Sequence, residues 1–358
     1  MNPDSKYGPT GLFTPFSFDH LDISQDLKSL LADTANHSVT RKTWSSYKSS
    51  VNKLNQFAEE TQTQVSFPLS DKISLAFTAW LLHSGVCAGT INTYLSGLKK
   101  FQHTLGLNTC SLRDPLINTT LKGKTNQENA LKLNGLTSTR LPMTPTLLKA
   151  WKLELGNSSL DRLDKRLIWA VSTLAFSGGF RGGELLPKEA HSFDPLTSLL
   201  GKHIALMPLN LGNEILDIIQ VKLRAEKQNK SNKPTVIDIY PSNGPLCPVN
   251  ALKKWLQVAG EMPLDLPAFR RGNGSFLTQS FINSLMKTLL SKHLEGINGS
   301  ISFHSLRIGL ASCLGSMGFS EQQIMCSGRW SSNAYTAYLK LPRTQRAEVA
   351  RAIGNLQL

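Results

Sequence analysis

Two short stretches in the second half of the sequence combine residue types that could bind a phosphate or another oxyanion. In SGGFRGGELL, Arg181 lies between two glycine pairs, and Glu184 follows three residues later. In FHSLR, His304 and Arg307 are also three residues apart, at the start of a predicted helix. Guanidinium holds two phosphate oxygens and stays charged, imidazole exchanges a proton near neutral pH, and a helix start attracts anions. The alternatives are an Arg–Glu pair that only caps a helix and a histidine with a purely structural role.

A third stretch, VKLRAEKQNKSNKPTV, carries a dense run of cations. The β-branched residues around it predict two antiparallel strands, within 214–227 and 234–241, joined by a basic turn. Such a turn could face phosphates, or it could be a solvated hairpin tip. Its cations are Lys222, Arg224, Lys227, Lys230 and Lys233.

The fourth stretch, SGRWSSNAYTAYLK, spans residues 327–340 and holds two of the six tyrosines of the chain. Arg329 precedes Trp330, and Tyr338 follows Arg329 by nine residues, with Tyr335 one helical turn earlier. Either this segment is a helix with aromatic packing, or one tyrosine does chemistry.

Helices are predicted to position these residues. Periodic apolar residues indicate helices at 38–61, 70–85, 89–106 and 113–129, which together form a bundle over 38–130. Further helices are predicted near 145–155, 160–177, 248–260, 277–293, 304–317, 320–327, 331–340 and 343–354. The fold class is therefore mainly α with a small antiparallel β-sheet. The exposed faces of the bundle are expected to carry Arg41, Lys42, Lys48, Lys53, Lys99, Lys100, Lys122 and Lys124.

Composition shifts divide the chain into parts. Residues 1–37 are predicted to be a flexible acidic segment, since residues 1–40 hold two basic and five acidic residues. A Gly- and Pro-containing linker is predicted at 131–143, a second domain at 144–341 and a C-terminal helix at 342–358.

The net charge of +14, from 39 Lys+Arg against 25 Asp+Glu, indicates a polyanionic partner. Nucleic acid is favoured over an anionic membrane surface. The five cysteines have no zinc-binding spacing and suit a reducing compartment. No apolar run approaches the roughly 20 residues that span a bilayer, and no secretory signal is visible. The chain is expected to be soluble and intracellular, nuclear if eukaryotic and otherwise cytoplasmic.

In their order along the chain, the four stretches resemble the tyrosine recombinases (the phage integrase family) over roughly residues 140–340. Residues 38–130 resemble the core-binding domain of that family. The context of the hairpin lysines and GRWSSNAY most resembles recombinases of eukaryotic mobile elements of the crypton and DIRS type. This resemblance implies an N-terminal core-binding bundle and a C-terminal catalytic domain.

The resemblance also implies roles for single residues. Arg181, His304 and Arg307 would bind the phosphate, His304 donating to its oxygens or taking the proton of the nucleophile, with Glu184 as a supporting acid. Lys227, or alternatively Lys230, would be the general acid. Tyr338 would be the nucleophile, and Tyr335 a packing residue or a phosphate neighbour. Arg329 stands where many members have His or Trp, so a third phosphate contact or a packing cation beside Trp330 is expected.

Such an enzyme would cleave and rejoin strands of double-stranded DNA through a 3′-phosphotyrosyl intermediate, as a homo-tetramer and without metal or cofactor. The other cations of the bundle and hairpin would contact DNA, and the C-terminal helix would be exchanged between subunits. Two alternatives stay open. One is a catalytically silent DNA-binding protein derived from a mobile element, and the other is a DNA-relaxing enzyme resembling type IB topoisomerases.

Overall fold

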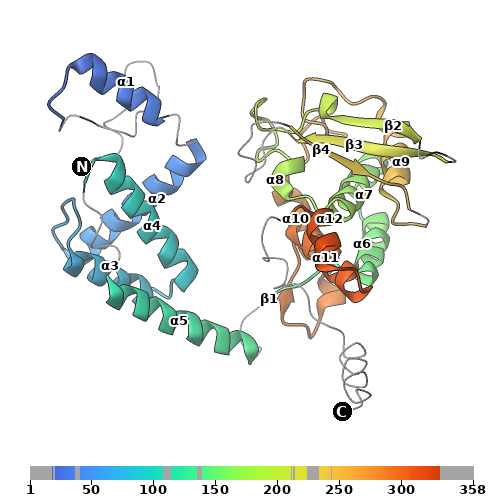
Figure 1. Cartoon of the computed structure of the whole chain (residues 1–358). Helices are drawn as coiled ribbons and strands as arrows, with labels where there is room; N and C mark the ends of the chain where they lie inside the picture. Colours follow the sequence, from blue (N-terminus) through green and yellow to red (C-terminus); the bar gives the residue numbers. More distant parts are fainter. Residues whose placement is uncertain are drawn as a thin grey trace, which may run out of the picture. The chain divides into compact units, whose positions relative to one another are not determined.

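The chain folds into two compact units, Met1–Thr137 and Ser138–Leu358, each with its own hydrophobic core (Figure 1). The computed structural model describes residues 18, 21–36, 41–107, 114–134, 139–210, 212, 214–223, 234–242 and 244–330. Of the predicted features, residues 1–17, the hairpin turn, Tyr338 and the helix at 342–358 lie outside the described residues, and so do the side chains of Arg41 and Lys42.

The first unit is helical, as predicted. Its helices are α1 (Gln25–Asn36), α2 (Arg41–Thr61), α3 (Asp71–His83), α4 (Ala88–Thr104) and α5 (Pro115–Leu133). Helix α2 packs against α3 and α4, and α5 packs against the same two helices. The side chain of Ser70 accepts a hydrogen bond from the backbone of Ile73 and so sets the start of α3. The buried residues recur at helical spacing and include Val51, Leu54, Phe77, Leu81, Ile91, Leu98 and Ile117.

Helix α1 lies within the segment that was predicted to be flexible. The Ser24 hydroxyl accepts a hydrogen bond from the backbone of Leu27, which satisfies one free N–H of the first turn. Leu27 and Leu30 are exposed, so α1 forms without burying these side chains. The acidic composition of the segment is therefore compatible with a local helix.

The second unit is mostly helical with a small sheet, which confirms the predicted fold class. Its helices are α6 (Pro145–Asn157), α7 (Arg162–Ser177), α8 (Gly182–Leu185), α9 (Pro248–Ala259), α10 (Gln279–Leu289), α11 (His304–Ser316) and α12 (Glu321–Gly328). The 3-10 helices are η2 (Gly201–His203) and η3 (Ser291–Leu294).

The antiparallel sheet has the strand order β2-β3-β4, with β2 at Ile204–Asn210, β3 at Ile215–Leu223 and β4 at Thr235–Ile239. Strands β3 and β4 are the two predicted strands. Strand β2 lies in what was predicted to be a Pro-containing loop region, and it includes Pro208. Proline is tolerated there because β2 is an edge strand, which does not need every N–H for the ladder.

The predicted linker also contains a strand. Strand β1 (Thr139–Arg140) pairs in parallel with β5 (Gly299–Ser300). Two residues give no alternating pattern in the sequence, and the partner strand lies far along the chain, so periodicity could not reveal this pairing.

Helix α7 organises the core of the second unit. Its buried residues include Leu167, Ile168, Val171, Leu174 and Ala175, and it packs against α6, α9 and α11. The buried indole N–H of Trp151 in α6 donates to the Ser172 hydroxyl at 3.1 Å. A helix held on several sides is a rigid support for the turn that follows its C-terminus, and that turn carries Arg181.

Candidate active site

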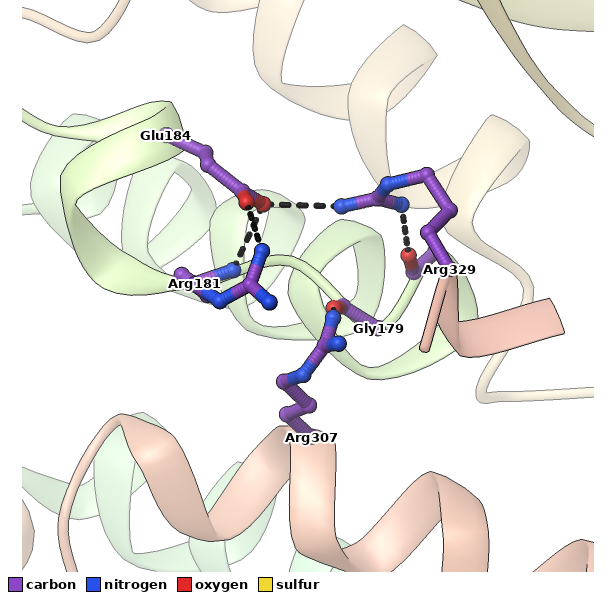
Figure 2. A network of polar contacts seen from close by, with 6 residues as sticks. Gly179, Arg181, Glu184, Arg307 and Arg329 are labelled. Atoms are coloured by element: carbon purple, nitrogen blue, oxygen red, sulfur yellow. Dashed lines mark hydrogen bonds and ion pairs between the residues drawn. The ribbon is translucent and has the colours of Figure 1, made fainter. Parts of the chain in front are cut away.

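Three elements bring charged side chains together at the C-terminal end of α7. These are the turn that leads into α8, the first turn of α11 and the residue that ends α12 (Figure 2). Gly179 in the turn has φ of +56°, a left-handed conformation that glycine adopts without strain. A Cβ at Gly179 would come within 3.0 Å of Leu310 in α11 and 3.1 Å of Gly328 in α12. The missing side chain therefore allows all three elements to meet.

Arg181 and Glu184 form a closed pair at the start of α8. The Arg181 backbone N–H donates to Glu184 Oε2 at 2.9 Å, and Arg181 Nη1 donates to Oε1 at 2.7 Å. The Glu184 side chain is 7 % exposed, whereas that of Arg181 is 31 % exposed. The same pair thus caps the helix and leaves a guanidinium partly exposed to solvent. Helix capping and phosphate binding, the two interpretations of the FRGGE stretch, are therefore compatible.

Arg329 is the second partner of Glu184. It ends α12 in the left-handed conformation, with φ of +54°. Its Nη2 donates to Glu184 Oε2 at 2.7 Å, and its Nη1 donates to the carbonyl oxygen of Gly178 at 2.6 Å. The guanidinium also lies 4.7 Å from the centroid of the Phe180 ring. One buried carboxylate therefore binds two guanidinium groups (Figure 2).

Arg307 is held beneath the site. Its guanidinium donates to the carbonyl oxygen of Gly179 and lies 4.5 Å from the centroid of the Trp330 ring. Arg307 is only 1 % exposed, and Trp330 is 9 % exposed. The arginine that stacks on Trp330 is therefore Arg307, while the neighbouring Arg329 turns toward Glu184.

His304 is the half-buried first residue of α11. Burial, followed by the positive charges of Arg140, Arg307 and Arg181, lowers the pKa of His304 below its ordinary value of 6.5. This shift favours the neutral imidazole at pH 7, the form that can accept a proton. Arg140 is the residue that sequence reasoning missed, because nothing in its local pattern connects it with a histidine more than 160 positions away.

No protein-family model and no curated protein sequence matches the chain. Solved structures do match it. The Tn1549 transposon integrase, in complex with circular intermediate DNA, has a TM-score of 0.52 and 15 % identity over 90 % of this chain and 98 % of its own. XerH recombinase bound to palindromic difH has a TM-score of 0.53 and 12 % identity, covering 92 % and 84 %. A lambda integrase dimer bound to a COC′ core site has a TM-score of 0.54 and 12 % identity, covering 88 % and 76 %.

The chain has the tyrosine recombinase fold. The matches cover 88 % or more of this chain, so they extend over both units. This confirms the predicted resemblance at the level of architecture. At 12–15 % identity the likeness concerns the fold, and the chemistry has to be argued from the residues themselves.

Within this recombinase fold, the structure brings Arg181, Glu184, His304, Arg307, Arg329 and Trp330 together. Lys222 is an exposed residue of β3. Lys99 and Lys100 on α4, and Lys122 and Lys124 on α5, are exposed or half-buried residues of the first unit. Lys53 donates to Gln56 at 2.8 Å and lies over Trp80. The remaining predicted site residues, namely Arg224, Lys227, Lys230, Lys233 and Tyr338, lie outside the described residues.

The described residues include no group of three or more His, Cys, Asp or Glu side chains that could bind a metal ion. None of the helices in the described part has the length and hydrophobicity that a bilayer crossing requires.

Proposed function

We propose that the chain is a tyrosine recombinase that cleaves and rejoins DNA strands for the movement of a mobile element. The observation that carries this proposal is the meeting of Arg181, His304 and Arg307 at the end of α7, in a chain with the recombinase fold. Fixed cations aimed at the oxygens of a phosphate stabilise the negative charge that develops when phosphorus is attacked. No metal ion or nucleotide is needed for that stabilisation.

The reaction begins with attack by the Tyr338 hydroxyl oxygen on the phosphorus of the scissile phosphate. The new P–O(Tyr) bond forms as the bond to the 5′-oxygen breaks, which leaves a 3′-phosphotyrosyl group and a free 5′-hydroxyl. Neutral His304 accepts the tyrosine proton, and Lys227 on the hairpin, or Lys230, protonates the leaving oxygen. Rejoining reverses these steps with a 5′-hydroxyl from another strand, so no outside energy source is required.

The roles of the three arginines differ in this proposal. Arg181 reaches the phosphate from its partly exposed position at the start of α8. Arg307 is 1 % exposed and lies 4.5 Å from the centroid of the Trp330 ring, so it would contribute a buried positive charge next to the phosphate. Arg329 acts as a positioning residue, because its two nitrogens already bind Glu184 and the Gly178 carbonyl.

The DNA partner follows from the charge of the chain. A net charge of +14 favours a polyanion, and most protein contacts to duplex DNA are made to phosphates. We expect the two units to act on one duplex, four chains to assemble for strand exchange, and residues 342–358 to be exchanged between neighbouring subunits.

A suicide-substrate experiment tests the proposal. Duplexes that bind the chain are first selected from a random pool, and nicked versions are then incubated with the full chain in the presence of EDTA. The wild type is expected to form a covalent protein–DNA adduct, Tyr338→Phe none, and the matched control Tyr335→Phe the same amount as wild type. If Tyr338→Phe still forms the adduct, the assignment of the nucleophile is wrong.

Adduct formation together with a plasmid-relaxation assay distinguishes the two other functions. A catalytically silent DNA-binding protein would bind the selected duplex without forming any adduct. A topoisomerase-like enzyme would also form the adduct, but it would relax supercoiled plasmid as a monomer and without site preference. Either result would overturn the recombinase proposal.

A further inference from the structure

The segment 139–143 lies directly against the start of α11. The backbone N–H of Leu141 donates to Ser300 at 3.0 Å, and that of Met143 donates to Ser305 at 2.8 Å. Gly309 in α11 has no room for a Cβ, which would overlap the backbone carbonyl of Met143. Together with the β1–β5 pairing, these contacts hold the backbone of Arg140 beside the residues that lead into His304.

The side chain of Arg140 differs from the other arginines around His304. Arg181 is paired with Glu184, and Arg307 is buried with its guanidinium on a carbonyl and under an indole ring. Arg140 is exposed, and its side chain makes no hydrogen bond or ion pair with the described part of the chain. Its charge nevertheless acts on His304, ahead of the charges of Arg307 and Arg181. It is thus a solvent-accessible cation at the site whose charge no described carboxylate offsets.

We propose that Arg140 is a further DNA-binding residue of the site, which binds a backbone phosphate next to the one held by Arg181 and His304. The proposal rests on the function proposed above. Arginine suits the role because its guanidinium is always charged and can hold two phosphate oxygens at once. Duplex DNA presents about one negative charge per 1.7 Å of helix axis, so a cation beside the bound phosphate meets further phosphates.

This role also explains why Arg140 is held by a backbone ladder. Arg140 lies on β1, and the partner strand β5 leads into α11. The second phosphate would therefore be bound at a fixed position relative to His304. An arginine on an unattached loop would contribute positive charge, but it would not fix the position of the bound DNA strand.

Binding measurements in the Tyr338→Phe background test this inference without depending on cleavage. Arg140→Gln is compared with Arg140→Lys and with Arg162→Gln. Arg162 is an exposed arginine at the other end of α7, and a rise of 1.5 Å per residue places it about 22 Å from Ser177. Selected duplexes are used whole and with single phosphates replaced by neutral methylphosphonates. Thermal unfolding of each variant checks that the fold is retained.

Arg140→Gln is expected to weaken DNA binding about 10-fold and to lower the slope of log affinity against log salt by about one. Arg140→Lys should keep the salt slope, and Arg162→Gln should behave as the unsubstituted chain. One methylphosphonate position should weaken binding by the parent and by Arg162→Gln, yet cause no further loss with Arg140→Gln.

The inference would be overturned if Arg140→Gln bound DNA with the affinity and salt slope of the unsubstituted chain. It would also be overturned if the affinity losses from Arg140→Gln and from the methylphosphonate were additive at every position. If wild type forms no adduct but the Arg140 contact is found, the recombinase proposal fails while Arg140 remains a phosphate-binding residue. If the adduct forms and Arg140→Gln binds normally, only the role of Arg140 is wrong.

Discussion

The candidate site has two sides, one at α8 and one at α11, and the positive charges of the arginines are accommodated differently on each. On the side of α8, Arg181 and Arg329 share the buried carboxylate of Glu184, with contacts of 2.7 Å from each. On the side of α11, the charges that act on His304 within the described residues are those of Arg140, Arg307 and Arg181, all positive. On the first side an acid offsets the cations, whereas on the second side burial and the positive charges lower the pKa of His304.

This difference indicates that the two sides have different roles. A buried carboxylate with two guanidinium partners fixes geometry, because each partner holds the others in place. A neutral imidazole among arginines leaves positive charge for an incoming phosphate to offset. Under the proposed function, the α8 side would position Arg181, and the α11 side would attract the phosphate.

The largest expected effect comes from removing the shared carboxylate. Glu184→Ala should lower the free energy of unfolding by about 3 kcal/mol, because it leaves two partly buried guanidinium groups without their acid. Chemical denaturation measures this change. The control is Asp217→Ala, which removes an acid from a much more exposed ion pair with Lys253 and should cost less than about 1 kcal/mol. Equal losses for the two variants would show that Glu184 is no more than a surface partner.

A smaller effect is expected from removing only one of the two partners. Arg329→Asn should lower the free energy of unfolding by about 2 kcal/mol, since it removes two charge-assisted hydrogen bonds. Asparagine accepts the left-handed backbone of this position, so the change reports on the guanidinium. Adduct formation should slow while DNA affinity stays near that of the wild type.

Double substitution sharpens this second prediction. Glu184→Ala combined with Arg329→Asn should cost less than the sum of the two single changes, because both remove the same contact. Strict additivity, or a loss of DNA affinity for Arg329→Asn as large as that for Arg181→Gln, would instead indicate that Arg329 contacts phosphate.

The smallest effect concerns the α11 side and its dependence on pH. The pKa of His304 is lowered by folding, so between the folded and unfolded pKa values the unfolded chain binds more protons. The contribution of His304 to stability is therefore complete above the unfolded value near 6.5 and is lost as the pH falls toward the folded value. Unfolding free energies of wild type and His304→Gln, measured from pH 5 to 8, should converge at the acidic end.

Arg140 provides the internal control for that titration. Arg140→Gln removes a positive charge that acts on His304, so it should raise the pKa of His304 and flatten the pH dependence. Arg162→Gln should leave it unchanged. If Arg140→Gln has no effect on the titration, the charge of Arg140 does not reach the imidazole, and the contrast between the two sides is weakened.

Much of the fold and part of the site could be predicted from the sequence because the signals are local. Helices such as α7 and α11 appear as apolar residues at helical spacing, and Arg181 with Glu184 appears as an i, i+3 pair. Strand β2 was missed because Pro208 is tolerated only by its edge position, which the sequence does not state. Strand β1 was missed because it is two residues long.

The sequence by itself determined the fold class, the basic character of the chain and the residue types of the site, since these depend on spacing within single turns and on summed charge. Only the tertiary structure decided which arginine binds which group. It paired Arg329 with Glu184 across 145 positions, placed Arg307 under Trp330, and brought Arg140 to His304. The physical reason is that these contacts join separate elements, and their geometry follows from how α7, α11, α12 and β1 pack together.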